Sequence, residues 1–168
     1  MADNKGSEMG EIEDKSVVVP PGEGRTPFAT EYPTLIRLAS GETEGVCSVV
    51  EITLPPGASP APLQAHTKAD QLNYVLEGVV SFELGERYVK APAGTLVFVP
   101  KGSACTLWNG EEEQARYFRI YIPAGHENIY DDIADIIAAD KVEGSAVRAL
   151  YAKYGIEIKQ TLPPYLRE

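Results

Sequence analysis

Two stretches of the chain say most about its fold: QAHTKADQLNYVLEG at residues 64–78 and GTLVFVPKGSACTLWN at residues 94–109. Both contain short runs of apolar, β-branched and aromatic residues, which favour β-strands. Glycine and proline interrupt them at Gly78, Gly94, Pro100 and Gly102, where tight turns are expected. The two stretches therefore predict short strands joined by short turns.

The same pattern extends outward over residues 32–123. Short β-rich runs recur there at intervals of about 8–12 residues, which is typical of a β-sandwich or a small barrel. The expected strands are Thr34–Ala39, Gly45–Leu54, Leu72–Leu76, Val79–Leu84, Tyr88–Ala91, Thr95–Val99, Cys105–Trp108 and Ala115–Ile122. Asn109-Gly110 predicts a hairpin turn after the seventh run, because both residue types tolerate positive φ.

The regions on either side of this block have a different composition. The acidic, apolar-poor start is expected to be disordered, and the residues after the block have apolar side chains at helical spacing. We predict a tail at 1–16, an arm with the first strand at 17–44, a barrel core at 45–122 and a helical extension at 123–168. Within that extension, the helices are expected at Glu127–Ala139 and Glu143–Tyr154.

Composition and charge exclude several classes of function. The 168 residues are enough for one domain, and 15 basic against 25 acidic residues give a net charge of -10. Such a charge disfavours nucleic acid and anionic membrane surfaces as partners. No apolar run approaches a membrane span, Met1–Ser16 is too polar for a signal peptide, and Cys47 and Cys105 form no disulfide framework. We expect a cytoplasmic protein.

The spacing within the first stretch places polar side chains together. Gln64 and His66 are two residues apart, so they point to one face of a strand, and Gln71 and Asn73 share a face in the same way. In a small antiparallel barrel, the inward positions of neighbouring strands converge on one cavity. A polar cavity is therefore expected.

Both stretches resemble the motifs of the cupin family over roughly residues 45–122. The family's first motif has two His, a Glu and a Gly, and the equivalent positions here are Gln64, His66, Gln71 and Gly78. Its second motif has Gly, Pro, Gly, His and Asn, and the equivalent positions here are Gly94, Pro100, Gly102, Cys105 and Asn109. The resemblance implies an all-β, cupin-like (jelly-roll) β-barrel in which Gln64, His66, Gln71 and Cys105 meet.

The departures from the family motifs leave the cofactor open. Family members with three His and one Glu hold Fe, Mn, Ni, Cu or Zn, and the resemblance implies that His66, Cys105, Gln64 and Gln71 would be the ligands here. Carboxamide oxygens are weak ligands for such metals, whereas His and Cys suit Zn or Cu(I). The alternatives are one divalent transition metal or a hydrogen-bonding cavity without metal.

Individual residues suggest roles within that cavity. His66 is expected to act as an acid or base near neutral pH, and Gln64 and Gln71 to hold carbonyl or phenol groups. Asn73, Tyr74, Cys105 and Tyr121 are further candidates for binding the substrate, with Cys105 favoured as a pocket-lining residue over a nucleophile. His126 is expected to be a capping or surface residue.

The resemblance also implies a class of function. The chain is similar to small flavonol-dioxygenase-like cupins and to fungal cupins of specialised metabolism. It implies an oxidoreductase or tailoring enzyme acting on a small organic substrate, aromatic or polyketide-derived. The alternatives are a metal-free isomerase, cyclase or dehydratase that uses His66, and a non-catalytic binding protein. A homodimer is expected, with the arm around Val17–Phe28 taking part.

Overall fold

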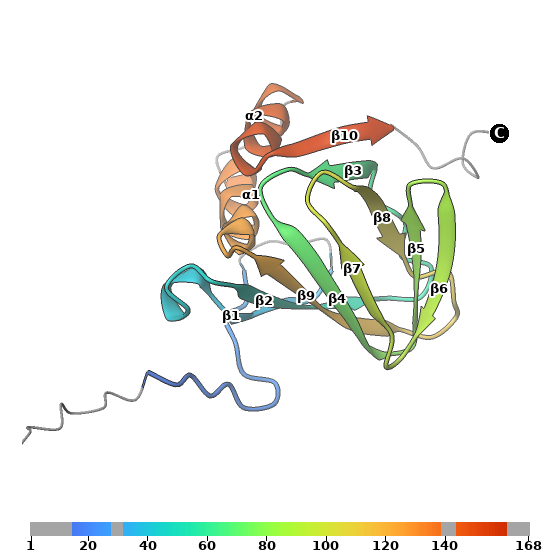
Figure 1. The fold of residues 1–168 in the computed structure, drawn as a ribbon, viewed down its shortest axis with the longest axis horizontal. Helices are drawn as coiled ribbons and strands as arrows, with labels where there is room; N and C mark the ends of the chain where they lie inside the picture. Colours follow the sequence, from blue (N-terminus) through green and yellow to red (C-terminus); the bar gives the residue numbers. More distant parts are fainter. Residues whose placement is uncertain (1–14, 28–31, 139–143, 161–168) are drawn as a thin grey trace, which may run out of the picture.

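Two five-stranded antiparallel sheets form the body of the protein (Figure 1). The structure is a computed structural model that describes residues 15–27, 32–138 and 144–160. One sheet has the order β1 (Thr34–Leu38), β2 (Ser48–Leu54), β9 (Ala115–Ile122), β4 (Asp70–Glu77) and β7 (Leu96–Val99). The other has the order β10 (Ile156–Gln160), β3 (Leu63–His66), β8 (Ala104–Trp108), β5 (Val79–Leu84) and β6 (Arg87–Pro92).

The hydrophobic core lies between the two sheets. Val50 and Val75 come from the first sheet, and Val80 and Phe82 from the second, and all four are fully buried. Each such side chain stabilises the fold by about 1.5–3 kcal/mol through removal of apolar surface from water. The all-β jelly-roll prediction is confirmed, although the described strands form two separate sheets and not one closed ring.

The C-terminal segment is helical, as expected. A 3₁₀ turn at His126–Asn128 leads into α1 (Ile129–Ala138), and α2 (Gly144–Tyr154) ends at Gly155, whose φ of +66° suits a helix-ending glycine. The two helices pack on each other through a cluster that includes Ile129, Leu150 and Tyr154. The chain then forms β10, which pairs with β3. The sequence pattern did not predict β10.

The predicted hairpin at Asn109-Gly110 is wrong. β8 and β9 belong to different sheets, so the segment between them crosses from one sheet to the other. The side chain of Asn109 is fully buried and donates to the carbonyls of Leu54, Pro55 and Glu113. Asn109 thus anchors the crossing segment through its amide.

The N-terminal arm runs beside β1. Arg25 pairs with Ile36 through two backbone hydrogen bonds of 2.8 and 2.9 Å, and its guanidinium binds Asp131 of α1 through both carboxylate oxygens. A short 3₁₀ turn at Ser40–Glu42 follows β1. Residues 1–14 of the predicted disordered tail lie outside the described residues. Neither described helix has the length and apolar character needed to cross a membrane.

Candidate functional site

A cavity of about 620 Å³ opens between the two sheets at the end covered by the helices. That volume is in the range of small-molecule sites. Strands of both sheets contribute to the wall, and Ile129, Tyr130 and Ile133 of α1 and Tyr151 of α2 close over it. The two helices therefore cover this opening of the cavity. Five tyrosines line the cavity: Tyr32, Tyr117, Tyr121, Tyr130 and Tyr151.

The four residues at the family's metal-ligand positions all line this cavity: Gln64, His66, Gln71 and Cys105. Gln64 and Cys105 are partners across β3 and β8, so their side chains are neighbours. Gln71 of β4 faces Tyr121 of β9 in the same way. The amide of Gly102 donates to the carbonyl of His66 at 2.7 Å, which ties the second motif to the first.

The surroundings of His66 favour the neutral form of its imidazole. Its side chain is 6% exposed, and its Nδ1 has no hydrogen-bond partner in the described residues. Burial lowers the pKa of His66 to about 3, and the nearby charges of Arg119 and His126 contribute to the fall. The empty cavity therefore does not support the predicted titration near neutral pH, because its walls disfavour the imidazolium form.

Cys105 has the character of a pocket-lining residue. Burial raises the pKa of its thiol to about 11, so the sulfur remains protonated at neutral pH. Its Sγ lies 3.6 Å from the carbonyl oxygen of Thr106 and makes no ion pair with His66. A nucleophilic role would need the opposite shift.

The remaining predicted binding residues occupy different places. Tyr121 lines the cavity and is almost completely buried. Asn73 is fully buried but not part of the cavity lining. Its side-chain oxygen accepts a hydrogen bond from Arg119, which does line the cavity. Tyr74 lies on the outer face of its sheet with 39% exposure, so the structure contradicts its expected place in the pocket. The reason is strand alternation, which turns Tyr74 away from the side that Gln71 and Asn73 share.

Arg119 of β9 is a cavity residue that the predicted site omitted. Its Nε donates to Asn73 Oδ1 at 3.1 Å, and its guanidinium lies 5.5 Å from the ring centre of Tyr117. It is the only charged residue among the described residues that line the cavity. The alternation of Ala115–Ile122 was the signal for it, since Arg119 shares a strand face with Tyr117 and Tyr121.

His126 is a second residue placed wrongly by the sequence. It is 4% exposed, stacks on Tyr121 at 5.0 Å between ring centres, and lies 5.1 Å from the ring of His66. The carboxylate of Glu127 accepts hydrogen bonds from the backbone amides of Ser40 and Gly125, and so stabilises the 3₁₀ turn that contains His126. No fixed spacing connects this residue to the two motifs, so the sequence carried no signal for its burial.

The donor set does not fit the metal of the wider family. The predicted ligands His66, Cys105, Gln64 and Gln71 supply one imidazole, one thiol and two amides, and amide oxygens are weak ligands for such metals. No cluster of three His, Cys, Asp or Glu side chains suited to a metal occurs in the described part of the chain. The guanidinium of Arg119 shares the cavity and repels a cation.

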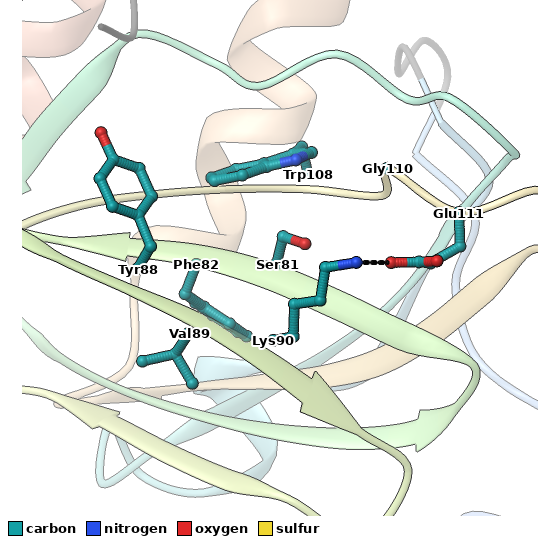
Figure 2. A pocket seen from close by; sticks show the side chains of 8 residues that line it. All are labelled: Ser81, Phe82, Tyr88, Val89, Lys90, Trp108, Gly110 and Glu111. Carbon is teal, nitrogen blue, oxygen red and sulfur yellow. Dashed lines mark hydrogen bonds and ion pairs between the residues drawn. The ribbon is translucent and has the colours of Figure 1, made fainter. Parts of the chain in front are cut away.

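A shallower pocket lies outside the other sheet and contains none of the predicted site residues (Figure 2). Tyr88 and Trp108 meet edge to face there, with ring centres 6.4 Å apart. Lys90 pairs with Glu111 at 2.6 Å, so its charge is already compensated within the pocket. At about 340 Å³ it is roughly half the size of the central cavity.

Comparison with protein families identifies the domain. Residues 50–121 match the family model of the cupin domain. No curated protein sequence matches the chain. The matched segment contains the strands from β4 to β8, most of β2 and β9, β3 and both motifs.

Solved structures share the same fold at low sequence identity. A predicted oxalate decarboxylase from Thermotoga maritima superposes with a TM-score of 0.57 at 18% identity, over 64% of this chain and 99% of that one. KdgF from Halomonas sp. superposes with a TM-score of 0.50 at 16% identity, over 60% of this chain and 87% of that one. The polyketide cyclase RemF from Streptomyces resistomycificus superposes with a TM-score of 0.49 at 20% identity, over 68% of this chain and 79% of that one. At these identities the likeness concerns the fold alone.

Proposed function

Taking residues 50–121 as a cupin domain, we propose that the chain is an enzyme that acts on a small organic molecule in the central cavity by proton transfer. The reaction classes are those of a cyclase, an isomerase or a dehydratase. The observation that carries the proposal is His66. Its imidazole is buried, and its Nδ1 has no hydrogen-bond partner among the described residues. No carboxylate of the described residues lines the same cavity.

The cavity offers a suitable environment for such chemistry. Tyrosine and isoleucine side chains provide flat apolar surface for an aromatic or unsaturated molecule. Gln64 and Gln71 each donate and accept hydrogen bonds, which suits a carbonyl group next to a labile C–H bond. His66 then accepts the proton, because burial keeps its imidazole in the neutral form.

The depressed pKa of His66 also favours a second candidate, a non-catalytic binding protein. An imidazole with a pKa of about 3 is a weak base in the empty cavity. Burial is the largest cause of this low pKa and the charge of Arg119 the next, so catalysis requires a bound ligand that raises the pKa of His66. Without such a ligand, the same cavity would bind and release a small molecule unchanged.

The oxidoreductase predicted from the resemblance stays a prediction, as does its place in specialised or polyketide metabolism. A dioxygenase of this fold needs a metal, and the donor set here is a poor match. Elemental analysis of the purified protein tests it directly. Stoichiometric metal that survives dialysis, and is lost in His66→Ala, would revive that assignment.

Proton transfer can be measured before the natural substrate is known. The protein is incubated in D₂O with a panel of aromatic ketones and β-keto acids, and C–H to C–D exchange is followed by NMR. We expect exchange that falls by about 10²–10⁴-fold in His66→Gln, the range typical of a removed general base. Tyr74→Phe, on the outer face, is the matched control and should exchange normally. Exchange that persists in His66→Gln, or is absent throughout the panel, would leave binding as the function.

A further inference from the structure

Arg119 is a cation without an anionic partner among the residues that the structure describes. Its Nε is taken by Asn73, but its two Nη atoms make no hydrogen bond to the described residues. No Asp or Glu in the described part of the chain forms an ion pair with it, and none lines the cavity. By contrast, Arg37 and Arg116 both pair with the buried carboxylate of Glu51, at 2.6 and 3.0 Å.

The neighbours of Arg119 are neutral at physiological pH. Burial raises the pKa of the Tyr117 phenol to about 12 and that of Cys105 to about 11, and it also raises the pKa of Tyr130. Guanidinium does not lose its proton in proteins. The cavity wall therefore carries one full positive charge that no group in residues 15–27, 32–138 and 144–160 compensates.

An uncompensated charge in a tyrosine-lined cavity costs stability. The protein nevertheless orients this group, since the fully buried amide of Asn73 accepts from Nε and leaves both Nη atoms for the cavity. A guanidinium presented in this way matches an anionic oxygen group, through charge-assisted hydrogen bonds.

We propose that Arg119 binds an anionic oxygen of the cavity ligand, so that the substrate is a small organic acid carrying a carboxylate or an acidic phenol or enol. This inference rests on the proposed use of the cavity as a substrate site. It defines the class of substrate and makes Asn73 the positioning residue for Arg119. The excess negative charge of the whole chain, -10, disfavours adventitious anion binding elsewhere.

Three ligands of nearly identical shape but different charge test the proposal by calorimetry: benzoate, benzamide and benzamidine. We expect benzoate to bind roughly 10–100-fold more tightly than benzamide, as for a charge-assisted hydrogen bond, and benzamidine to bind most weakly. 4-Nitrophenol separates the two sources of the anion, because its absorbance reports whether it binds as the phenolate. A phenolate that binds more tightly than benzoate would assign the site to phenols or enols.

Four variants complete the experiment. Arg119→Met should abolish the preference for benzoate over benzamide, and Arg119→Lys should keep part of it. Asn73→Asp places a carboxylate beside the guanidinium and should abolish the preference while Arg119 is still present. Arg87→Met removes the same charge from the exposed surface and should change nothing.

Binding and turnover fail separately in this design. Equal affinity for benzoate and benzamide, undetectable benzoate binding at millimolar concentration, or a preference that survives in Arg119→Met would each overturn the role of Arg119. Loss of the proton-transfer function alone would appear as D₂O exchange that is insensitive to His66→Gln, with the benzoate preference intact.

Discussion

The sheet that contains β4 and β9 departs from an ordinary β-sandwich on both of its faces, although its inner face also carries core residues such as Val75. On the inner face, β9 carries Tyr117, Arg119 and Tyr121, and β4 carries Gln71 and Asn73. On the outer face, four large apolar side chains are exposed: Tyr74, Leu96, Phe98 and Ile122. Sandwich strands normally place apolar residues inward and polar residues toward water. The polar inner face indicates a binding cavity, and the apolar outer face indicates a contact surface.

Which side chains face inward depends on the strand register, and Gly78 helps to fix it. A one-residue slip would exchange the two faces completely. Gly78 has a φ of +68°, and a Cβ at this position would clash with the carbonyl oxygen of Gln114 and lie 2.9 Å from Ala115 Cα. This close approach joins the turn after β4 to the start of β9.

The largest effect is therefore expected from Gly78→Ala. The left-handed backbone and the clash together should lower the free energy of unfolding by about 3 kcal/mol or more. Gly94→Ala is the matched control: its φ is +88°, but its Cβ would meet nothing within 4 Å, so about 1–2 kcal/mol is expected. Urea denaturation of both variants measures the difference. Equal losses would show that the contact with β9 does not hold the register.

The apolar outer face gives the predicted homodimer a contact surface. We propose that a second copy of the chain covers Leu96 and Phe98, which are 58% and 54% exposed, because the described helices cover the cavity opening instead. Phe98→Glu should then weaken the dimer by about 2 kcal/mol or more, from lost apolar burial and an added charge. Light scattering across a dilution series measures the change.

The N-terminal arm provides the competing contact for that dimer. Val18 is 85% exposed, so Val18→Glu disturbs the arm and leaves the sheet intact. A dimer that dissociates in Val18→Glu but resists Phe98→Glu would assign the contact to the arm. A monomeric wild-type protein would refute the homodimer prediction altogether.

The polar inner face should make the fold sensitive to acid. Unfolded His66 takes up a proton below pH 6.5, whereas folded His66 stays neutral until its pKa of about 3. Protonation therefore favours the unfolded state, and stability should fall by up to about 1.4 kcal/mol per pH unit below pH 6.5. Denaturation at pH 7.5, 6.5 and 5.5 should show a smaller slope in His66→Gln. Parallel slopes would show that the pKa of His66 is the same in the folded and unfolded states.

The sequence predicted the strands and the shared cavity better than it predicted the positive charge of Arg119 inside that cavity. Residue spacing of two put Gln64 and His66 on one strand face, and the resemblance to the cupin motifs implied that Gln64, His66, Gln71 and Cys105 meet in one cavity. Alternation in Ala115–Ile122 also separated the two faces of β9. It did not show that the face with Arg119 points inward, because the opposite face is the more apolar one and fits a core better.

His126 and β10 escaped prediction for a different reason. Both lie in the C-terminal extension, outside the two motifs, and their positions depend on how the helices pack back onto the sheets. Glu127, which holds the turn before α1, is fully buried although its sequence context resembles a solvated helix start. Tertiary contacts of this kind leave no local pattern in a single sequence.

The smallest effect is expected from His126→Phe, which separates the shape of the inner face from its chemistry. His126 stacks on Tyr121 with an angle of 23° between the rings, and its Nε2 is buried without a hydrogen-bond partner in the described residues. Phenylalanine keeps the stacking surface and removes the unpartnered nitrogen, which offsets the lost hydrogen bond to the Tyr154 backbone. Stability by urea denaturation at pH 7.5 should therefore change by less than about 1 kcal/mol. A loss above about 2 kcal/mol would mean that the imidazole Nε2 has a polar partner, and that the inner face needs its second histidine for more than packing.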